Sequence, residues 1–186
     1  MNKKILCTGD PNKTSTLAHA VKKLFPNAEF LHRSMGVDLT TEEGLSVFKE
    51  TVADFDVFIN SSYIGPGVQE RLLRITKELW TEGYVFNIGS VAEYQSADVN
   101  CMDRTYIDSK ISLRNTSMAL GWYDFKTTHL LIGGFKDITD PADPRMDPLR
   151  IVEIIDWIMN SNEFWISSIS VLGPPINDLR PSTDIS

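Results

Sequence analysis

The chain has 186 residues, of which 42% are hydrophobic and 23% charged, and this composition is typical of one globular domain with a substantial core. Its 18 Lys and Arg against 25 Asp and Glu give a formal net charge of −7, which argues against a nucleic-acid-binding surface. The two cysteines are too few for a disulfide scaffold, no apolar run is long enough to span a membrane, and no signal-peptide pattern opens the chain. We therefore expect a cytoplasmic protein without nucleic-acid or membrane partners.

Short apolar runs alternate with segments of helical apolar spacing along the whole chain. The predicted strands span residues 4–8, 29–31, 56–60, 85–88, 128–132 and 166–172, and the clearest predicted helices span residues 68–79, 106–120 and 149–159. This alternation predicts right-handed βαβ units, and so an α/β fold: a Rossmann-like, doubly wound parallel sheet of about six to seven strands in three αβα layers. We expect one domain over residues 1–186, with its ligand bound beyond the carboxyl ends of the strands.

The first predicted strand ends in the turn Gly9-Asp-Pro-Asn, and a predicted helix follows it. Thr14 or Ser15 is the expected cap of that helix. A helix N-terminus favours an anion, and Lys13, Thr14 and Ser15 supply side-chain donors beside it. The turn is therefore a candidate phosphate-binding loop, although an ordinary capped turn has the same residues.

A second candidate site combines Ser90, which follows the predicted strand that Gly89 stops, with Tyr106 and Lys110 at the start of a predicted helix. Residues four apart on a helix are neighbours, so the phenol of Tyr106 should lie beside the ammonium of Lys110. A positive charge next to a phenol favours its ionised form, and such a phenol exchanges protons with an alcohol or carbonyl oxygen. The Ser90 hydroxyl would hold the same oxygen.

This set of serine, Tyr-x-x-x-Lys and strand-to-helix context resembles the active site of the short-chain dehydrogenase/reductase family. The resemblance implies hydride transfer between a nicotinamide cofactor and a carbonyl or alcohol group on a small-molecule substrate. In that mechanism Tyr106 would be the general acid for reduction, Lys110 would assist Tyr106 and bind the nicotinamide ribose, and Ser90 would hydrogen-bond the substrate oxygen. The family also makes a homo-oligomer possible.

The resemblance extends to the cofactor-binding segments. Thr8-Gly9 matches the start of the family's Thr-Gly-x-x-x-Gly-x-Gly loop, but Lys13 and Ser15 stand at the other two glycine positions. The lost glycines would let the backbone approach a pyrophosphate, so cofactor contact through Gly9, Lys13, Thr14 and Ser15 requires a rearranged loop. The match to a P-loop, which would indicate a phosphotransferase, is poor because no glycine precedes Lys13.

Five further positions are implied to contact the cofactor, besides Tyr106 and Lys110 themselves. Arg33 and Ser34 follow the second predicted strand, where a guanidinium and a hydroxyl suit a 2′-phosphate, so NADP(H) is preferred and NAD(H) is possible. A solvated loop arginine is the alternative. Asp38 would contact the adenine, and Gly133 replaces the proline of the family's Pro-Gly…Thr element along the nicotinamide. Asn60 matches the first residue of its Asn-Asn-Ala-Gly segment.

Two departures support a rival hypothesis. The interval from Asn60 to Ser90 is shorter than in the family, and the asparagine that usually supports the lysine from a helix there has no identifiable counterpart. A catalytically silent nucleotide-binding or interaction module on the same fold would tolerate these losses. Residues 137–148, rich in aspartate and proline, are expected to form a lid rather than a metal site, and the three histidines form no metal pattern.

Overall fold

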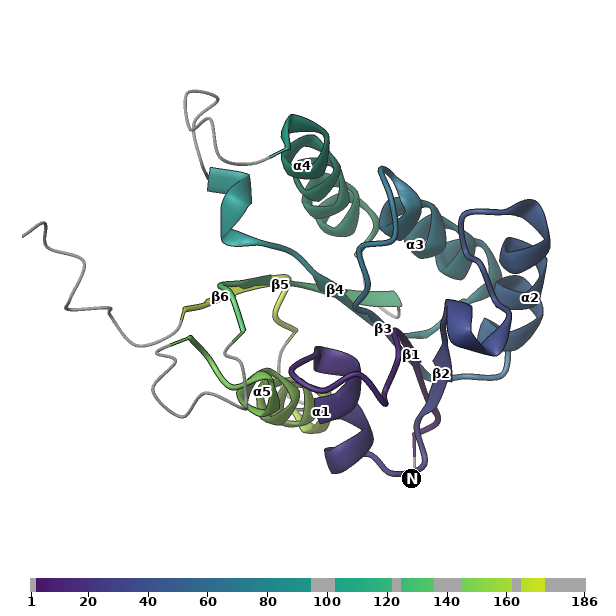
Figure 1. Ribbon diagram of the computed structural model, residues 1–186, viewed down its shortest axis with the longest axis horizontal. Coiled ribbons are helices and arrows are strands. Elements are labelled where there is room, and N and C mark those ends of the chain that lie inside the picture. The colour runs from purple at the N-terminus through teal and green to yellow at the C-terminus, as the bar shows by residue number, and fades with distance from the viewer. Residues whose placement is uncertain (1–2, 95–102, 122–124, 136–144, 162–164, 173–186) are drawn as a thin grey trace, which may run out of the picture.

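The computed structural model describes residues 3–94, 103–121, 125–135, 145–161 and 165–172 (Figure 1). Six parallel strands form one sheet in the order β2-β1-β3-β4-β5-β6. Their bounds are β1 (Ile5–Thr8), β2 (Glu29–Leu31), β3 (Val57–Asn60), β4 (Gly83–Ile88), β5 (Phe125–Ile132) and β6 (Ser168–Val171). All six expected strands are confirmed, and the longest, β5, begins three residues earlier than its apolar pattern predicts, because Phe125 and Thr127 pair with β4.

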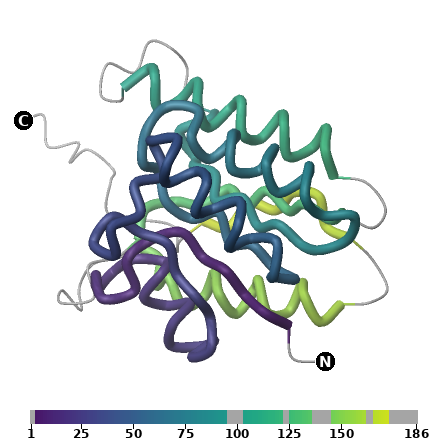
Figure 2. The backbone as a smooth tube through the Cα atoms, turned by 90° about the vertical axis from the view of Figure 1, so that its right-hand side faces the viewer, coloured from purple at the N-terminus to yellow at the C-terminus, as the bar shows by residue number. Residues whose placement is uncertain are grey.

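Helices cover both faces of the sheet (Figure 1). One layer contains α1 (Leu17–Leu24) and α5 (Pro148–Asn160), and the other contains α2 (Glu42–Val52), α3 (Val68–Leu79) and α4 (Arg104–Leu120). Figure 2 shows the same sandwich from the side, with α4 and α5 on opposite sides of the strands. Short 3₁₀ turns form η1 (Arg33–Met35) and η2 (Val91–Tyr94). The predicted αβα doubly wound fold is therefore confirmed.

Each helical layer has its own hydrophobic core against the sheet. Alternate residues along β1 point to opposite faces, so Cys7 packs with α1 and α5 whereas Leu6 packs with α2 and α3. Burial raises the pKa of the Cys7 thiol and so disfavours the reactive thiolate. Of the helices within the described ranges, none has the length and apolarity needed to span a bilayer.

The strand order places a topological switch point between β1 and β3, because the chain leaves β1 toward β2 and then returns to the other side. Thr8 and the segment after β3 close this point. The Thr8 Oγ1 accepts hydrogen bonds from the Ser61 and Ser62 amides at 2.9 and 3.1 Å, and the Ser62 hydroxyl donates to the Thr8 carbonyl at 3.1 Å. These bonds fix the first strand end, where Gly9 begins the turn into α1.

Gly9 adopts φ 127°, and a Cβ there would lie 2.8 Å from Ser62 Oγ and 3.0 Å from Ala18 Cβ. We expect Gly9→Ala to lower the free energy of unfolding by about 2 kcal/mol or more, from backbone strain and close contact together. Gly36→Ala is the matched control, because Gly36 has φ 82° but open space around its Cβ position. Urea unfolding should give a loss of about 1 kcal/mol for this control. Equal losses in the two variants would contradict the close contact.

The cap of α1 corrects one expectation. Neither Thr14 nor Ser15 caps the helix; Thr16 does, and its Oγ1 accepts from the His19 amide at 3.2 Å. Ser15 adopts φ 61°, a left-handed conformation, whereas an N-cap needs an extended one. Ser15 stands at a position where the short-chain dehydrogenase/reductase family has glycine, and its backbone has a conformation that favours glycine.

Candidate active site

A cleft of about 710 Å³ opens at the carboxyl ends of β3, β4 and β5. The residues that line it are Ser61, Tyr63, Ile88, Gly89, Ser90, Val91, Asp103, Tyr106, Lys110, Ile132, Gly133, Gly134 and Phe135. The fold therefore brings the three expected catalytic residues, Ser90, Tyr106 and Lys110, to one cavity. Its position agrees with the rule that open parallel sheets bind ligands beyond the carboxyl ends of their strands.

Lys110 lies at the bottom of the cleft with only 3% of its surface exposed. Its Nζ donates to the Gln69 Oε1 at 2.6 Å and to the Ile88 carbonyl at 2.7 Å. Burial lowers the pKa of Lys110 to about 8, although the negative charge of Glu93 acts in the opposite direction. Lys110 is thus a cation held in place by two acceptors.

Two tyrosine rings border this ammonium. The Nζ of Lys110 lies 5.6 Å from the centroid of the Tyr106 ring and 5.8 Å from that of Tyr63. The two rings meet edge to face, with centroids 4.8 Å apart. Asp103 caps α4 by accepting from the Thr105 amide at 2.9 Å and so starts the helix just before Tyr106. Sequence reasoning missed Tyr63, because its place in the cleft depends on how the loop after β3 folds.

Ser90 follows β4 and is half-buried. Its amide donates to the Glu93 Oε1 at 2.9 Å, and its Oγ accepts from the Ala92 amide at 3.2 Å. The Oγ thus accepts from its own turn and retains its O–H for an acceptor in the cleft. The structure therefore assembles a hydroxyl, a phenol and a buried ammonium around one space.

No known family model matches the sequence, and no curated protein matches it. Solved structures do match. A short-chain dehydrogenase/reductase described as glucose/ribitol dehydrogenase from Brucella melitensis aligns with a TM-score of 0.68 at 15% identity over 91% of this chain and 95% of that chain. A bulky-bulky ketone specific alcohol dehydrogenase from Comamonas testosteroni aligns with a TM-score of 0.66 at 15% identity over 94% and 87%. An oxidoreductase of the short-chain dehydrogenase/reductase family from Brucella ovis, in complex with a partially ordered NAD, gives 0.63 at 13% over 91% and 100%.

The chain has the fold of the short-chain dehydrogenases/reductases. At these identities the similarity establishes the fold alone, so activity must be argued from the residues of the site.

A buried polar row lies behind the cleft of this short-chain dehydrogenase/reductase fold. Asn60, Asn87 and His129 stand side by side in β3, β4 and β5, and all three are fully buried. The Asn60 Nδ2 donates to the Asn87 Oδ1 at 2.9 Å and to the Gln69 carbonyl at 2.8 Å. Asn60 was expected to bind the cofactor. Its side chain bonds within this row and is not among the residues that line the cleft, and the cofactor contact stays a prediction.

Gln69, on α3, is a site residue that sequence reasoning missed. Its Nε2 donates to the Asn60 carbonyl at 2.8 Å while its Oε1 accepts from Lys110. Gln69 thus supports Lys110 from a helix between Asn60 and Ser90, the interval in which the short-chain dehydrogenase/reductase family has an asparagine. Only the helical spacing from Val68 could have indicated that position 69 faces inward, and a glutamine next to the start of an apolar stripe is a weak signal.

The candidate phosphate-binding loop lies beyond the end of β1. Lys13 and Thr14 are exposed and Ser15 is half-buried, next to the N-terminus of α1. The loop is closed by its own bonds, since the Thr16 hydroxyl donates to the Lys13 carbonyl at 2.7 Å. Gly9, which has φ 127°, leaves the backbone at the strand end without a side chain. Exposed cationic and hydroxyl groups at a helix N-terminus fit a diphosphate, with contacts from side chains in place of glycine backbone.

The expected nucleotide-recognition residues lie after β2, but they already have partners. Arg33 pairs with Asp38, with Nε 3.1 Å from Oδ2, and the Ser34 hydroxyl donates to Asp10 at 3.0 Å. Hydrogen bonds from the Asn12 amide and from Ser34 lower the pKa of the Asp10 carboxyl, so Asp10 is an anion beside the position expected for a 2′-phosphate.

Gly133 and Gly134 follow β5 and border the cleft, with open space at the Cβ position of Gly133. The backbone at Gly133 is therefore open to the cleft. Residues 137–144 of the expected lid, which include Thr139 at the threonine position of the family's Pro-Gly…Thr element, lie outside the described residues. The described parts of the chain contain no group of three or more histidine, cysteine, aspartate and glutamate side chains arranged to hold a metal ion.

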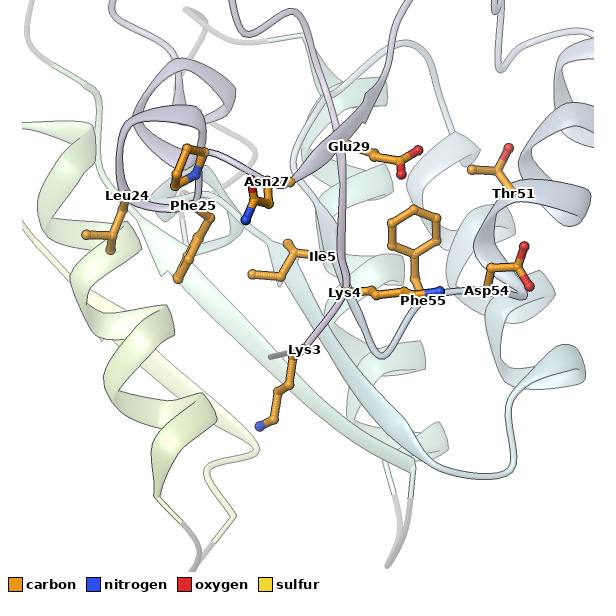
Figure 3. A pocket seen from close by; sticks show the side chains of 12 residues that line it. Lys3, Lys4, Ile5, Leu24, Phe25, Asn27, Glu29, Thr51, Asp54 and Phe55 are labelled. Carbon is orange, nitrogen blue, oxygen red and sulfur yellow. The ribbon is translucent and has the colours of Figure 1, made fainter. Parts of the chain in front are cut away.

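A second hollow, of about 560 Å³, lies at the opposite, amino end of β1 and β2 (Figure 3). Figure 3 shows Lys3, Lys4, Glu29 and Asp54 around its rim. The Lys3 Nζ donates to the Met159 carbonyl at 2.7 Å, so this cation already has a structural role. Without the serine, tyrosine and lysine of the first cleft, this hollow has no comparable chemistry.

Proposed function

We propose that this protein is an NAD(P)(H)-dependent oxidoreductase that interconverts a carbonyl and an alcohol on a small substrate, with Ser90, Tyr106 and Lys110 as its catalytic residues. The observation that supports this function best is the buried Lys110 ammonium beside the Tyr106 ring, in a cleft that also holds Ser90. An ammonium is costly to bury, so a fold that retains one at a strand-end cleft indicates a functional use.

The roles follow from the contacts. The Ser90 O–H donates to the substrate oxygen, and the Tyr106 phenol delivers a proton to the same oxygen during reduction. Lys110 stabilises the negative charge that develops on the phenol oxygen, and its bonds to Gln69 and Ile88 prevent it from turning away. A nicotinamide cofactor, when bound, would supply the hydride, and Gly133, which has open space at its Cβ position, would leave room for the nicotinamide ring.

The deciding experiment has two stages. NADPH and NADH are first titrated against the intrinsic fluorescence of the purified protein, which has four tryptophans. A panel of simple ketones, aldehydes and secondary alcohols is then assayed for a change in nicotinamide absorbance. Quenching together with turnover supports the oxidoreductase. If neither reduced cofactor binds, the proposal fails and the silent module on the same fold is favoured.

For the nucleotide we propose NADP(H) in preference to NAD(H), with Arg33 released from Asp38 to bind the 2′-phosphate. Arg33→Ala should then weaken NADPH binding about tenfold, the value of one charge-assisted pair, and leave NADH binding unchanged. Arg71→Ala is the control, because Arg71 forms a similar exposed pair with Glu42 at 2.8 Å on the outer helices. An equal effect on both cofactors in the fluorescence titration would contradict the assignment.

A further inference from the structure

Glu93, in η2, is a buried acid to which the proposed mechanism assigns no role. Its side chain is 0% exposed, and a carboxylate is expensive to bury unless it is paired. Its partners come from three segments: the Ser90 amide at 2.9 Å, the His129 Nε2 at 3.0 and 3.2 Å, and the Arg114 Nη1 at 3.7 Å. These contacts place a negative charge directly behind Ser90.

The hydrogen-bond pattern of His129 indicates how this charge is held. Its Nδ1 is buried and has no partner among the described residues, whereas its Nε2 faces Glu93. A buried N–H without an acceptor would be costly, so we assign the single ring proton to Nε2, where it is donated to the carboxylate. A neutral imidazole orients Glu93 without cancelling its charge, and Arg114 is the nearby cation on α4.

Glu93 and Lys110 fix the same strand end. Lys110 donates to the Ile88 carbonyl, and Glu93 accepts from the Ser90 amide on the other side of Gly89. A Cβ on Gly89 would lie 2.2 Å from the His129 Nε2 and 2.5 Å from the Glu93 Oε1, so the acid and the imidazole pack directly on the backbone. The end of β4 is therefore held between a buried anion and a buried cation.

The other groups around Lys110 do not balance its charge. Gln69 from α3 and Tyr63 from the loop after β3 contact it as neutral groups, as does Tyr106 on its own helix. Asp103 lines the same cleft but is exposed, where water screens it. The charge of Glu93 raises the pKa of Lys110 against the larger effect of burial.

We propose that Glu93 is a positioning residue of this active site, which holds the Ser90 backbone in place and supplies the buried counter-charge that keeps Lys110 protonated. The consequence for catalysis rests on the proposed function. The electrostatic part does not, because it concerns a proton on Lys110 that is measurable without cofactor or substrate.

The test measures the titration of Lys110 by NMR on protein labelled with ¹³C at lysine Cε, with the signal assigned through Lys110→Met. We expect Glu93→Gln to lower the pH at which Lys110 loses its proton by about one pH unit or more. The alkaline limb of kcat/KM for carbonyl reduction should move by the same amount. Glu93→Asp, which keeps the charge, should restore both. Glu50→Gln, an exposed substitution on α2, should change neither.

An unchanged Lys110 titration in folded Glu93→Gln would overturn the proposal and leave Glu93 a purely structural residue. A shifted titration in a protein that reduces no carbonyl would support the charge coupling and contradict the proposed function instead. If Glu93→Gln does not fold, Arg114→Gln gives the second test. Without the cation facing Glu93, Lys110 should keep its proton to higher pH, and an unchanged titration there would equally overturn the proposal.

Discussion

Replacing Tyr106 with phenylalanine should lower the rate of carbonyl reduction about a thousandfold, while the dissociation constant for the reduced cofactor changes by no more than about twofold. The expected size is that of a lost general acid, which contributes roughly 10² to 10⁴ in rate. Binding should persist because only the hydroxyl is removed. The ring keeps its edge-to-face contact with Tyr63 and its place over the Lys110 ammonium.

Tyr94→Phe is the matched control for this experiment. Tyr94 is exposed, ends η2, and lies against Arg114, with 5.6 Å from the guanidinium carbon to the ring centroid. Unlike Tyr106, Tyr94 is not one of the residues that line the cleft. Removing its hydroxyl should therefore change the rate of carbonyl reduction by less than about twofold. Steady-state kinetics on both variants, with cofactor affinity from fluorescence, separates the two outcomes. Residual activity of Tyr106→Phe close to wild type would exclude Tyr106 as the proton donor.

The sequence was sufficient for those parts of the molecule that local patterns determine. Strands of β-branched and aromatic residues such as β4 are recognisable because they are buried on both faces, and Gly121 ends α4 at the expected position. The strand-end rule placed Ser90 at the ligand-binding edge of the sheet, helical spacing placed Tyr106 beside Lys110, and the family resemblance joined the two.

The supporting residues could not be predicted, because their roles depend on segments that meet only in the folded chain. Gln69 contacts Lys110 from another helix, and Glu93, in the 3₁₀ turn after β4, contacts His129 of β5. In the sequence, Glu93 is an ordinary acid in a polar stretch, with no spacing that indicates a buried anion. Asn60 is a further case, since the hydrogen bond from its Nδ2 to the Asn87 Oδ1 joins two neighbouring strands, and nothing in the sequence around either residue indicates it.

The stability of the protein should depend on pH through Lys110. Burial lowers the pKa of its ammonium from the ordinary value of 10.5 to about 8 in the folded state. Below about pH 8 the folded protein carries the full cost of the buried charge, and the unfolded chain binds more protons between the two values. Stability from this group therefore rises as the pH increases from about 8 to about 10.5, by about 3 kcal/mol in total.

Lys110→Met removes this pH dependence, so the difference in unfolding free energy between the wild type and the variant isolates the contribution of Lys110. The variant leaves the Gln69 Oε1 and the Ile88 carbonyl without their donor, which costs a roughly constant amount at every pH. Other titrating groups, including the tyrosines, are common to both proteins and cancel in the difference. Urea unfolding at several values between pH 7 and 10.5 should therefore show the wild type gaining on the variant only above about pH 8. Parallel curves would mean that folding does not lower the pKa of Lys110, and the expected effect of burial on this ammonium would be wrong.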